Sequence, residues 1–444
     1  MATDRDLTTG SVPGRLYQMS WPMVVGIAAT MSVPLADAYF LGQLGTRELA
    51  AISYTAPVVL TLMSLAIGLG SGTASVVSRA VGEGDGEKVK RVATDAVLLS
   101  FAIVSVLSVA GWLLTRPIFS ALGASGRTLD LVVDYMEVWF VGLPPLSIMM
   151  VASNLLRANG DAKSVSLIMI GAAAFNLALD PVLIFGWGPV PALGVAGAAW
   201  ATLVSRVLLI GFAAWLIVVR DRLVTTTLPD RRTLWRSWRE VGRIALPSSL
   251  GNAVNPLGIT VVTGVLASYG DDVVAGFGTA TRIESFVAIP MLAMSSAIGP
   301  IAGQNFGRGL HGRVRTAHRS SYAFSFGYAL LAAAILWFAA PGIAGLFTAD
   351  VAIVDVIVLY LRIVPATLMG FGVTVVAAGG MNAVGAPLRG LAVYAVRTVM
   401  LYVPLAFVAA RLGPPVWVFA AIALANLLAG LFVWWWSLRF FRAE

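Results

Sequence analysis

Apolar residues fill twelve long runs of the chain, separated by short polar segments. Each run is long enough to cross the hydrocarbon core of a bilayer as a helix, which takes roughly 20 residues at about 1.5 Å each. The pattern therefore predicts an all-α polytopic membrane protein with twelve transmembrane helices. The predicted spans lie near residues 16–40, 53–79, 93–115, 130–156, 164–186, 194–219, 244–269, 279–305, 320–341, 354–382, 390–411 and 415–438.

The second half of the sequence repeats the first at an offset of about 225 residues, as is typical of transporter folds. Six spans in each copy give both copies the same orientation, so we predict two pseudo-symmetric six-helix bundles related by an axis along the membrane normal. We expect an N-terminal lobe at residues 1–219, a cytoplasmic linker at 220–243 and a C-terminal lobe at 244–444. Equivalent residues of the two copies include Pro22 and Pro247, Tyr135 and Tyr360, and Gly160 and Gly385.

The composition agrees with a membrane protein, since 58% of the residues are hydrophobic and 12% are charged, against roughly 25% charged in a soluble domain. The formal net charge is +8. About 22 of the 30 Lys and Arg residues lie in the loops and tails on one predicted side, which is the pattern that marks the cytoplasm. We therefore expect a protein of the cell membrane with both termini in the cytoplasm, and no nucleic-acid partner.

Residue types that serve metal and nucleotide chemistry are scarce. The chain has no cysteine, and its two histidines, His311 and His318, are expected to share one basic loop. The glycine-rich segment at residues 82–86 follows a span and lacks the Gly-Lys-Ser/Thr ending of a phosphate-binding loop, so it is interpreted as a turn. We expect no enzyme activity, no cofactor and no ATP-driven transport by this chain alone.

The first predicted span contains an acid, Asp37. An aspartate at the centre of a membrane helix costs about 2.5 to 3.5 kcal/mol, so such a residue normally faces a cavity or a partner and serves ion or proton movement. Pro22 and Pro34 lie in the same span, and each removes a backbone donor, which predicts a bend. The sequence thus predicts a bending helix with a titratable group.

Three further polar residues fall at a similar depth: Asn176 and Asp180 in the fifth span and Thr202 in the sixth. At about 1.5 Å per residue their depths agree with that of Asp37 within roughly 8 Å, so one pocket in the outer half of the N-terminal lobe is feasible. The equivalent positions of the second copy are apolar, which assigns this chemistry to the first lobe. Those positions are Val262, Leu401, Leu405 and Leu427.

Two carboxylates, an amide and a hydroxyl supply oxygen ligands for a small cation, and a close carboxylate pair can also hold one proton near neutrality. The four residues are therefore a candidate Na⁺ or H⁺ site, and the choice of ion stays open. Each also has a structural interpretation: Asp180 precedes Pro181 and can cap a helix break, and Thr202 can bond its own helix.

Two more charged residues lie within spans. Arg206 is one turn from Thr202, where it either pairs with an acid of the cluster or reaches a water-filled cavity. Glu284 lies in the eighth span near Arg282 and is the best candidate for a polar group in the C-terminal lobe, although a structural pair explains it as well.

Several segments, taken in order, resemble the multidrug and toxic compound extrusion family over nearly the whole chain. They are SWPMVVG followed by PLADAYFLGQLG, then LGSGTASVVSRAVGEGD with its later echo IGPIAGQNFGRG, and FNLALDPVLIF in the fifth span. The acids in spans one and five match the prokaryotic DinF-like branch, in which Asn176 and Thr202 would complete the polar site. The resemblance implies a V-shaped pair of six-helix bundles that works by alternating access.

The resemblance also implies a secondary active multidrug exporter, which moves small organic, often amphipathic or cationic compounds against an H⁺ or Na⁺ gradient. We expect a monomer in contact with membrane lipids. A lipid or lipid-linked oligosaccharide flippase of similar architecture is the alternative, and it would need a cationic cavity, for which Arg206 and Arg397 are the mid-span candidates. A channel or receptor is a third hypothesis, which the duplicated lobes disfavour.

Overall fold

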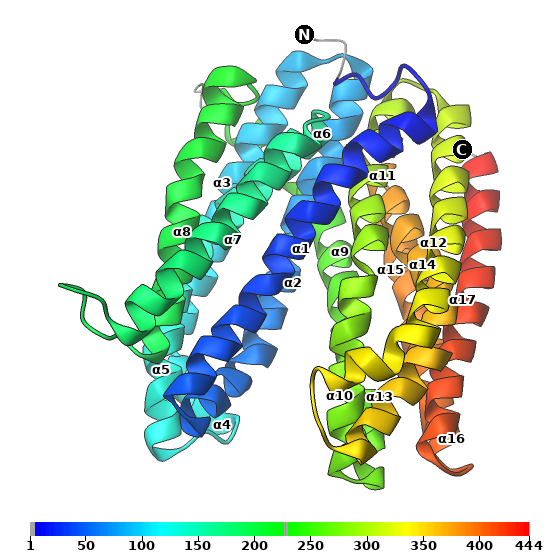
Figure 1. Ribbon diagram of the computed structural model, residues 1–444. Coiled ribbons are helices and arrows are strands. Elements are labelled where there is room, and N and C mark those ends of the chain that lie inside the picture. The colour runs from blue at the N-terminus through cyan, green and yellow to red at the C-terminus, as the bar shows by residue number, and fades with distance from the viewer. Residues whose placement is uncertain (1–4, 226, 228–229, 444) are drawn as a thin grey trace. The chain divides into compact units, whose positions relative to one another are not determined.

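The computed structural model describes residues 5–225, 227 and 230–443, and nearly all of them are helical (Figure 1). In this part of the chain ten helices are long and apolar enough to cross a membrane, and there are up to 12 if each of two bent helix pairs forms one span. The predicted all-α polytopic fold with twelve transmembrane helices is therefore confirmed.

Contacts divide the chain into two units. The N-terminal unit is Val25–Ser249, and the C-terminal unit is Leu250–Glu444 together with Met1–Val24. Two helices contribute to both units: α1 (Val12–Leu44) and α9 (Arg231–Leu266). The bounds predicted for the lobes and the linker stay a prediction.

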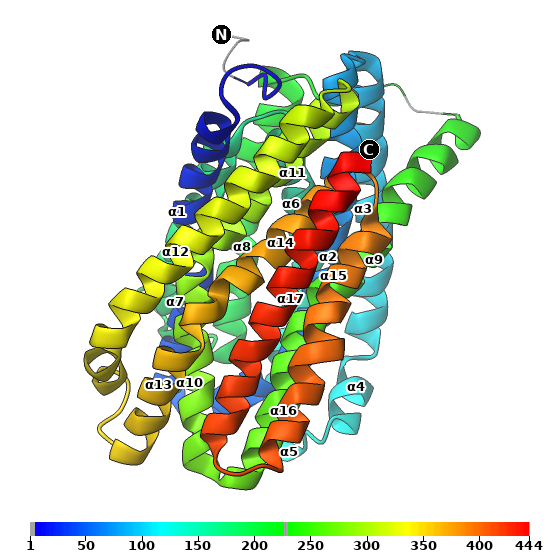
Figure 2. The same ribbon diagram turned by 90° about the vertical axis from the view of Figure 1, so that its right-hand side faces the viewer.

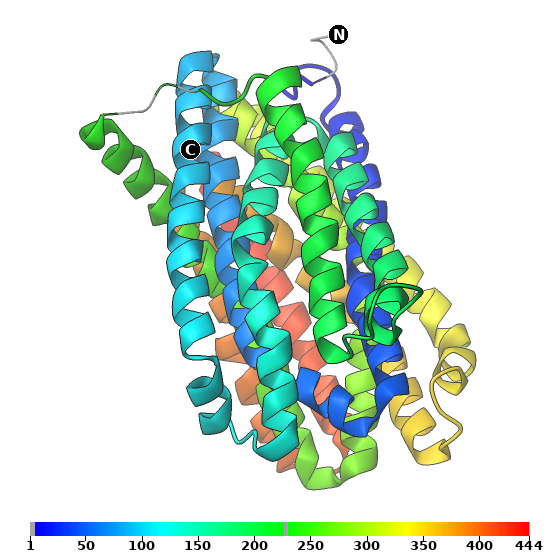
Figure 3. The same ribbon diagram turned by 90° about the vertical axis from the view of Figure 1, so that its left-hand side faces the viewer.

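The N-terminal unit is a bundle in which α7 and α8 lie side by side (Figure 3). A short π-helical turn, Leu216–Arg220, follows α8. The helices of this unit are α2 (Thr46–Glu83), α3 (Gly86–Leu113), α4 (Thr115–Ala121), α5 (Gly126–Val141), α6 (Leu143–Ala158), α7 (Ala162–Phe185) and α8 (Val195–Trp215).

The C-terminal unit is a second bundle, in which α17 contacts α14 and α16 (Figure 2). A π-helical turn, Val396–Tyr402, joins α15 to α16, and 3-10 turns occupy Ala267–Tyr269 and Pro365–Thr367. The helices are α10 (Asp271–Val287), α11 (Ile289–Gly307), α12 (His311–Gly345), α13 (Val351–Ile363), α14 (Leu368–Ala383), α15 (Pro387–Ala395), α16 (Val403–Ala410) and α17 (Pro415–Ala443).

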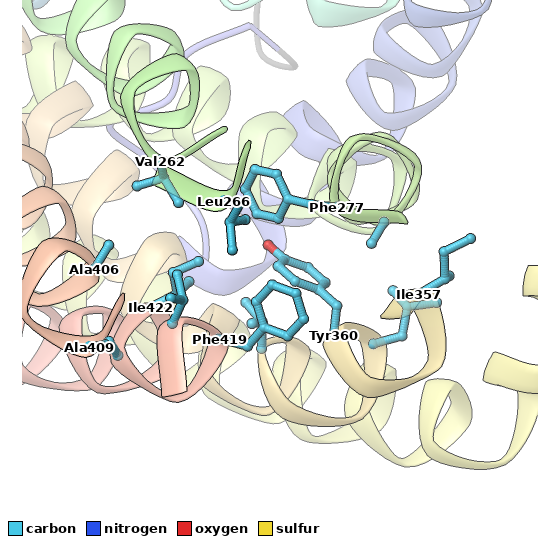
Figure 4. Packing of buried hydrophobic residues seen from close by; sticks show 14 of the residues in the cluster. Val262, Leu266, Phe277, Ile357, Tyr360, Ala406, Ala409, Phe419 and Ile422 are labelled. Atoms are coloured by element: carbon cyan, nitrogen blue, oxygen red, sulfur yellow. The ribbon is translucent and has the colours of Figure 1, made fainter. Parts of the chain in front are cut away.

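Three aromatic rings form the centre of the core of the C-terminal unit (Figure 4). The rings of Phe277 and Phe419 are stacked with centroids 6.3 Å apart. Tyr360 meets both of them edge to face, at 5.6 Å and 5.2 Å. Edge-to-face pairs add about 0.5–1.5 kcal/mol each beyond the area they bury. The packing therefore holds the ring of Tyr360, which belongs to α13, against α10 and α17.

Two predicted spans are broken rather than continuous. Residues 130–156 fall on α5 and α6, which meet at a bend of 45°, and residues 279–305 fall on α10 and α11, which meet at 46°. Prolines open the second helix of each pair, because a proline at the start of a helix loses no intrahelical hydrogen bond.

Helices α9 and α12 begin well before their predicted spans, at Arg231 and His311. The expected basic loop with both histidines is therefore wrong: His318 is buried inside α12, where its Nδ1 lies 2.8 Å from the carbonyl oxygen of Val314. Its ring also packs 3.8 Å from the ring of Phe441. Hydropathy detects only the apolar part of a helix, so polar extensions beyond the membrane escape it.

Residues 7–10, just before α1, are hydrogen-bonded to the C-terminal unit. The backbone N–H of Leu7 donates to Oε1 of Gln304 at 3.1 Å, and Nδ2 of Asn305 donates to the carbonyl of Leu7 at 3.0 Å. Nη1 of Arg313 donates to the carbonyl of Gly10 at 2.9 Å. These contacts explain why the first residues belong to this unit rather than to the helices that follow them.

The glycines that recur in the repeat share a backbone conformation. Gly160 and Gly385 have φ values of 83° and 82°, a region that residues with a side chain rarely adopt. Each ends the helix before it and turns the chain toward the next one. In the first copy Asp161 follows directly and accepts a hydrogen bond at 2.9 Å from the backbone N–H of Ser164, so it caps α7.

Candidate functional site

The four residues predicted to form a cation site all lie in the N-terminal unit. Asp37 is on α1, Asn176 and Asp180 are one turn apart on α7, and Thr202 is on α8. Helices α7 and α8 are in contact along their length, and Nδ2 of Asn176 donates to Oγ1 of Thr202 at 3.1 Å. This hydrogen bond fixes the amide so that its oxygen, rather than its nitrogen, is left for another partner.

The carboxyl groups of Asp37 and Asp180 are close neighbours, although no hydrogen bond joins them in the described part of the chain. A hydrogen bond between them would need a proton on one of them, because two ionised carboxylates have no donor. Asp180 is fully buried, with 0% exposure. Negative charges on both neighbouring acids would repel each other, so a bound proton or cation would stabilise the pair.

Several oxygen atoms of this cluster have no hydrogen-bond partner although they are enclosed by protein. They are Oδ1 of Asp37, both carboxyl oxygens of Asp180 and Oδ1 of Asn176. Buried acceptors are nearly always paired in folded proteins, so an unpaired buried acceptor is a candidate for binding a ligand. Together with Oγ1 of Thr202, these four atoms form a cluster of oxygen acceptors in the N-terminal unit.

Two further residues surround the acid pair. Tyr135 on α5 lies within electrostatic range of both acids, and Arg206 on α8 lies within range of Asp37 and Tyr135. The sequence prediction included Arg206 and omitted Tyr135. The available signal was the repeat, which aligns Tyr135 with Tyr360, but the alignment does not say which residues the ring approaches.

Glu284 belongs to a second polar cluster, inside the C-terminal unit. Its carboxyl accepts a short hydrogen bond from the hydroxyl of Tyr360. Arg397, on the π-helical turn, donates from Nη1 to Oδ1 of Asn255 at 2.7 Å and from Nε to Oδ1 of Asn426 at 3.0 Å. Glu284 therefore contacts α13 rather than its sequence neighbour Arg282.

The residues of this second cluster do not occupy the positions that the repeat makes equivalent to the first cluster. The equivalents of Asn176, Asp180 and Thr202 are leucines, and the polar residues lie beside them, since Arg397 is one turn before Leu401 and Asn426 directly precedes Leu427. A comparison at one fixed offset therefore missed them.

The predicted bend of α1 stays a prediction. Both prolines lie within the helix, which is assigned without a break from Val12 to Leu44. Pro34 is exposed. It lies three residues before Asp37, which is half-buried. A search of the described residues finds no group of three or more His, Cys, Asp or Glu side chains suited to a metal ion.

Comparison with known proteins gives a single family. The MatE family model matches residues 22–182 and 247–408, so it matches once in each copy of the repeat. A FAD transporter of Shewanella oneidensis is 36% identical over 416 residues, which cover 94% of this chain and 92% of the relative. The multidrug export protein MepA of Staphylococcus aureus is 27% identical over 88% of this chain and 86% of its own.

Solved structures agree over almost the entire length. A MATE transporter in complex with MaL6 superposes with a TM-score of 0.93 at 27% identity, covering 99% of this chain and 98% of the other. A mutant of the Vibrio cholerae MATE transporter VcmN also gives 0.93, at 28% identity and 98% coverage of both chains. With twelve spans and a matching model in each half, the chain belongs to the MATE family of multi-span membrane proteins that export drugs and toxic compounds, and it is a transporter rather than an enzyme.

Proposed function

We propose that this transporter is a secondary antiporter that exchanges small organic compounds for H⁺ or Na⁺, and that the ion binds at Asp37, Asp180, Asn176 and Thr202. The observation that supports this site is the set of enclosed oxygen atoms without hydrogen-bond partners on the first three of these residues. No other cofactor is part of the proposal. The acids face each other across α1 and α7, so one ion or proton is shared by two helices.

Ion binding can drive a conformational change only if it favours one state over another. Neutralising the acid pair lowers the free energy of enclosing it away from water, so the loaded state favours a closed, dehydrated pocket. In the proposed cycle this closure changes the bend of α1 near Pro22 or Pro34. Release of the organic compound follows from that movement.

The proposed substrates are small and amphipathic, and many would be cationic. The name of the Shewanella oneidensis relative widens this class, because FAD carries phosphate groups and a planar ring system. We further propose that the transporter works as a monomer, in contact with lipids of the plasma membrane and without nucleic acid. The excess of basic residues in alternate loops supports placing both termini in the cytoplasm.

The test is uptake of a fluorescent lipophilic cation into inside-out proteoliposomes. Uptake is compared under a proton gradient, under a sodium gradient and without either, for the wild type, Asp37→Asn and a control, Glu137→Gln, whose side chain is exposed on α5. We expect uptake under one gradient that Asp37→Asn abolishes and Glu137→Gln preserves. Gradient-driven uptake by Asp37→Asn at the wild-type rate would refute the proposed site.

A wild type that transports nothing under either gradient would refute antiport itself. Attention would then move to the flippase alternative, which a lipid-scrambling assay addresses in the same vesicles.

A further inference from the structure

Arg397 is a charged residue buried within the C-terminal unit, with 4% of its surface exposed. A charge inside a membrane protein is expensive, so such a residue generally pairs with another charge or lines a pathway. The proposed coupling site does not use it, because that site lies in the N-terminal unit. Its presence therefore needs an explanation of its own.

The guanidinium group is held in one orientation. Nη1 and Nε donate to the amide oxygens of Asn255 and Asn426, and Nδ2 of Asn426 donates in turn to Oγ1 of Thr367 at 3.2 Å. The ring centroids of Phe371 and Tyr402 lie 4.9 Å and 5.6 Å from the guanidinium carbon, which is within cation–π range. Residues from α9, α14, α17 and the 3-10 and π-helical turns thus fix this one side chain.

None of these direct contacts neutralises the charge, because amide oxygens and aromatic faces are uncharged. Glu284 is the acid within electrostatic range, yet it forms no ion pair within 4.0 Å of Arg397 among the residues described, and its carboxyl is already bonded to Tyr360. The arrangement keeps the positive charge in place while it leaves the guanidinium free of a carboxylate contact.

One donor of the guanidinium also remains available. Nη2 donates to no residue in the described part of the chain, and it is not among the enclosed polar atoms that lack a partner. It is therefore not fully enclosed, and keeps a small accessible surface on a side chain that is 4% exposed. An arginine edge fixed by neutral amides, with one nitrogen accessible, is an arrangement that suits an oxyanion, because guanidinium donors match the geometry of carboxylate and phosphate oxygens.

We propose that Arg397 recognises a carboxylate or phosphate group of the compounds that this transporter exports. Phe371 and Tyr402 add aromatic surface beside the guanidinium, so the favoured ligand joins an oxyanion to a planar apolar body. The inference rests on the proposed transport function and specifies its substrate class. It also separates two tasks between the units, since the acids of the N-terminal unit bind the coupling ion and the arginine of the C-terminal unit binds the anionic part of the cargo.

The experiment compares two xanthene dyes of similar shape and opposite charge, anionic carboxyfluorescein and cationic rhodamine 6G, in gradient-driven transport by proteoliposomes. The variants are Arg397→Gln, Arg397→Lys and a matched control, Arg362→Gln. Arg362 also lies over an aromatic ring, 5.6 Å from the centroid of Trp337, but it is exposed. Thermal unfolding in detergent shows whether each variant is folded.

We expect Arg397→Gln to lower carboxyfluorescein transport by about 10- to 100-fold, the range of one charged hydrogen bond, and to change rhodamine transport less than about twofold. Arg397→Lys keeps the charge without the planar fork, so it should fall between these values. The control should change neither dye. An equal loss for both dyes would assign Arg397 a structural role, and unchanged carboxyfluorescein transport by Arg397→Gln would also overturn the proposal.

The outcomes for the wild type separate this inference from the function on which it rests. Transport of rhodamine without carboxyfluorescein would refute the anion site and leave the antiporter intact. Transport of neither dye would refute the antiporter, and binding of carboxyfluorescein to the purified protein, measured by tryptophan quenching, would then decide the anion site alone.

The oxyanion could also come from a phospholipid headgroup, and a second assay distinguishes this source. The same vesicles are prepared with fluorescent phosphatidylglycerol or with fluorescent phosphatidylcholine. Arg397-dependent movement of phosphatidylglycerol, with carboxyfluorescein unaffected, would replace the soluble cargo by a lipid and refute export of soluble anions through this residue.

Discussion

The two units of this chain each contain a polar cluster, and the two clusters differ in how well their hydrogen bonds are satisfied. In the N-terminal unit, oxygens of Asp37, Asn176 and Asp180 are enclosed without partners. In the C-terminal unit, Glu284 accepts from Tyr360 and Arg397 donates to two asparagines. One fold has thus been duplicated, and of these two clusters, within the described residues, the N-terminal one keeps carboxyl and amide oxygens without partners.

The state of these hydrogen bonds determines which cluster responds to a bound ion. Unpaired buried acceptors destabilise the state that contains them, so a proton or cation that satisfies them shifts the balance between conformations. A network whose members already satisfy each other gains little from such a ligand and instead rigidifies its surroundings. We interpret the N-terminal cluster as the switch and the C-terminal cluster as a fixed frame that presents one arginine.

The largest effect should follow from Asp180→Asn. Without this carboxylate the site loses its electrostatic attraction for a proton or cation. We therefore expect gradient-driven transport to fall by about 100-fold, which corresponds to about 2.8 kcal/mol. Stability should rise by about 1 kcal/mol, and the melting temperature by about 1 °C in a chain of this length, because an unpaired buried carboxylate is gone. Proteoliposome transport and thermal unfolding in detergent measure the two effects.

Glu137→Gln is again the control, since this acid lies on the exposed face of α5. A melting temperature for Asp180→Asn well below that of the wild type would mean that Asp180 is a structural partner. The N-terminal and C-terminal clusters would then not differ in how well their hydrogen bonds are satisfied.

A second effect, on stability alone, should follow from Gly370→Ala on α14. A Cβ at this position would lie 1.9 Å from the carbonyl oxygen of Asn426, so α14 and α17 would have to separate. Overpacking of this kind costs about 1–3 kcal/mol. We expect a lower melting temperature, and the same shift should disturb the hydrogen bond from Asn426 to Thr367.

Gly327→Ala provides the matched control, because a Cβ at Gly327 on α12 meets nothing within 4 Å. This change should be neutral or slightly stabilising, since alanine favours a helix by up to about 1 kcal/mol over glycine. Equal destabilisation by both changes would show that the close packing of α14 against α17 does not contribute specifically to the stability of the C-terminal unit.

The repeat offers a sharper comparison through its equivalent tyrosines. Tyr360→Phe leaves the carboxyl of Glu284 without its donor, which should destabilise the protein by about 1–3 kcal/mol. Tyr135 makes no hydrogen bond within the residues described, so Tyr135→Phe should cost less than about 0.5 kcal/mol. Thermal unfolding measures both, and similar losses for the two variants would contradict the difference between the clusters.

Much of this arrangement could be predicted from the sequence, because helical rise converts residue number into depth. The depths of Asp37, Asn176, Asp180 and Thr202 suggested a common level, and the structure joins Asn176 to Thr202 and brings Asp37 to Asp180. The spans and the duplication followed from hydropathy in the same way. The role of these residues in ion binding stays a prediction.

Sequence reasoning failed where the lateral packing of helices decides the contacts. Depth alone does not reveal that Tyr135 lies near the acids, nor that Arg397 reaches Asn255 on α9 and Asn426 on α17. The approach of Gly370 to Asn426 depends on interhelical distance, for which a single sequence contains no signal. Hydropathy likewise missed the polar first turns of α9 and α12.

The smallest predicted effect concerns the hydroxyl of Thr202. Thr202→Val removes the acceptor that fixes the amide of Asn176, at a cost of about 1 kcal/mol. We therefore expect the coupling-ion concentration for half-maximal transport to rise by about fivefold, with little change in the maximal rate. Thr202→Ser keeps the oxygen and should restore the wild-type value.

The matching change in the other unit tests whether ion dependence belongs to one cluster or to both. Oγ1 of Thr367 accepts from Asn426 at 3.2 Å, much as Oγ1 of Thr202 accepts from Asn176, so Thr367→Val removes a bond of the same kind. If the C-terminal cluster is a fixed frame, Thr367→Val lowers the melting temperature and leaves the ion dependence of transport unchanged. A shift in ion dependence as large as that of Thr202→Val would mean that the coupling ion acts on both clusters, because a purely local structural loss in the C-terminal unit has no route to the affinity of a site on α1, α7 and α8.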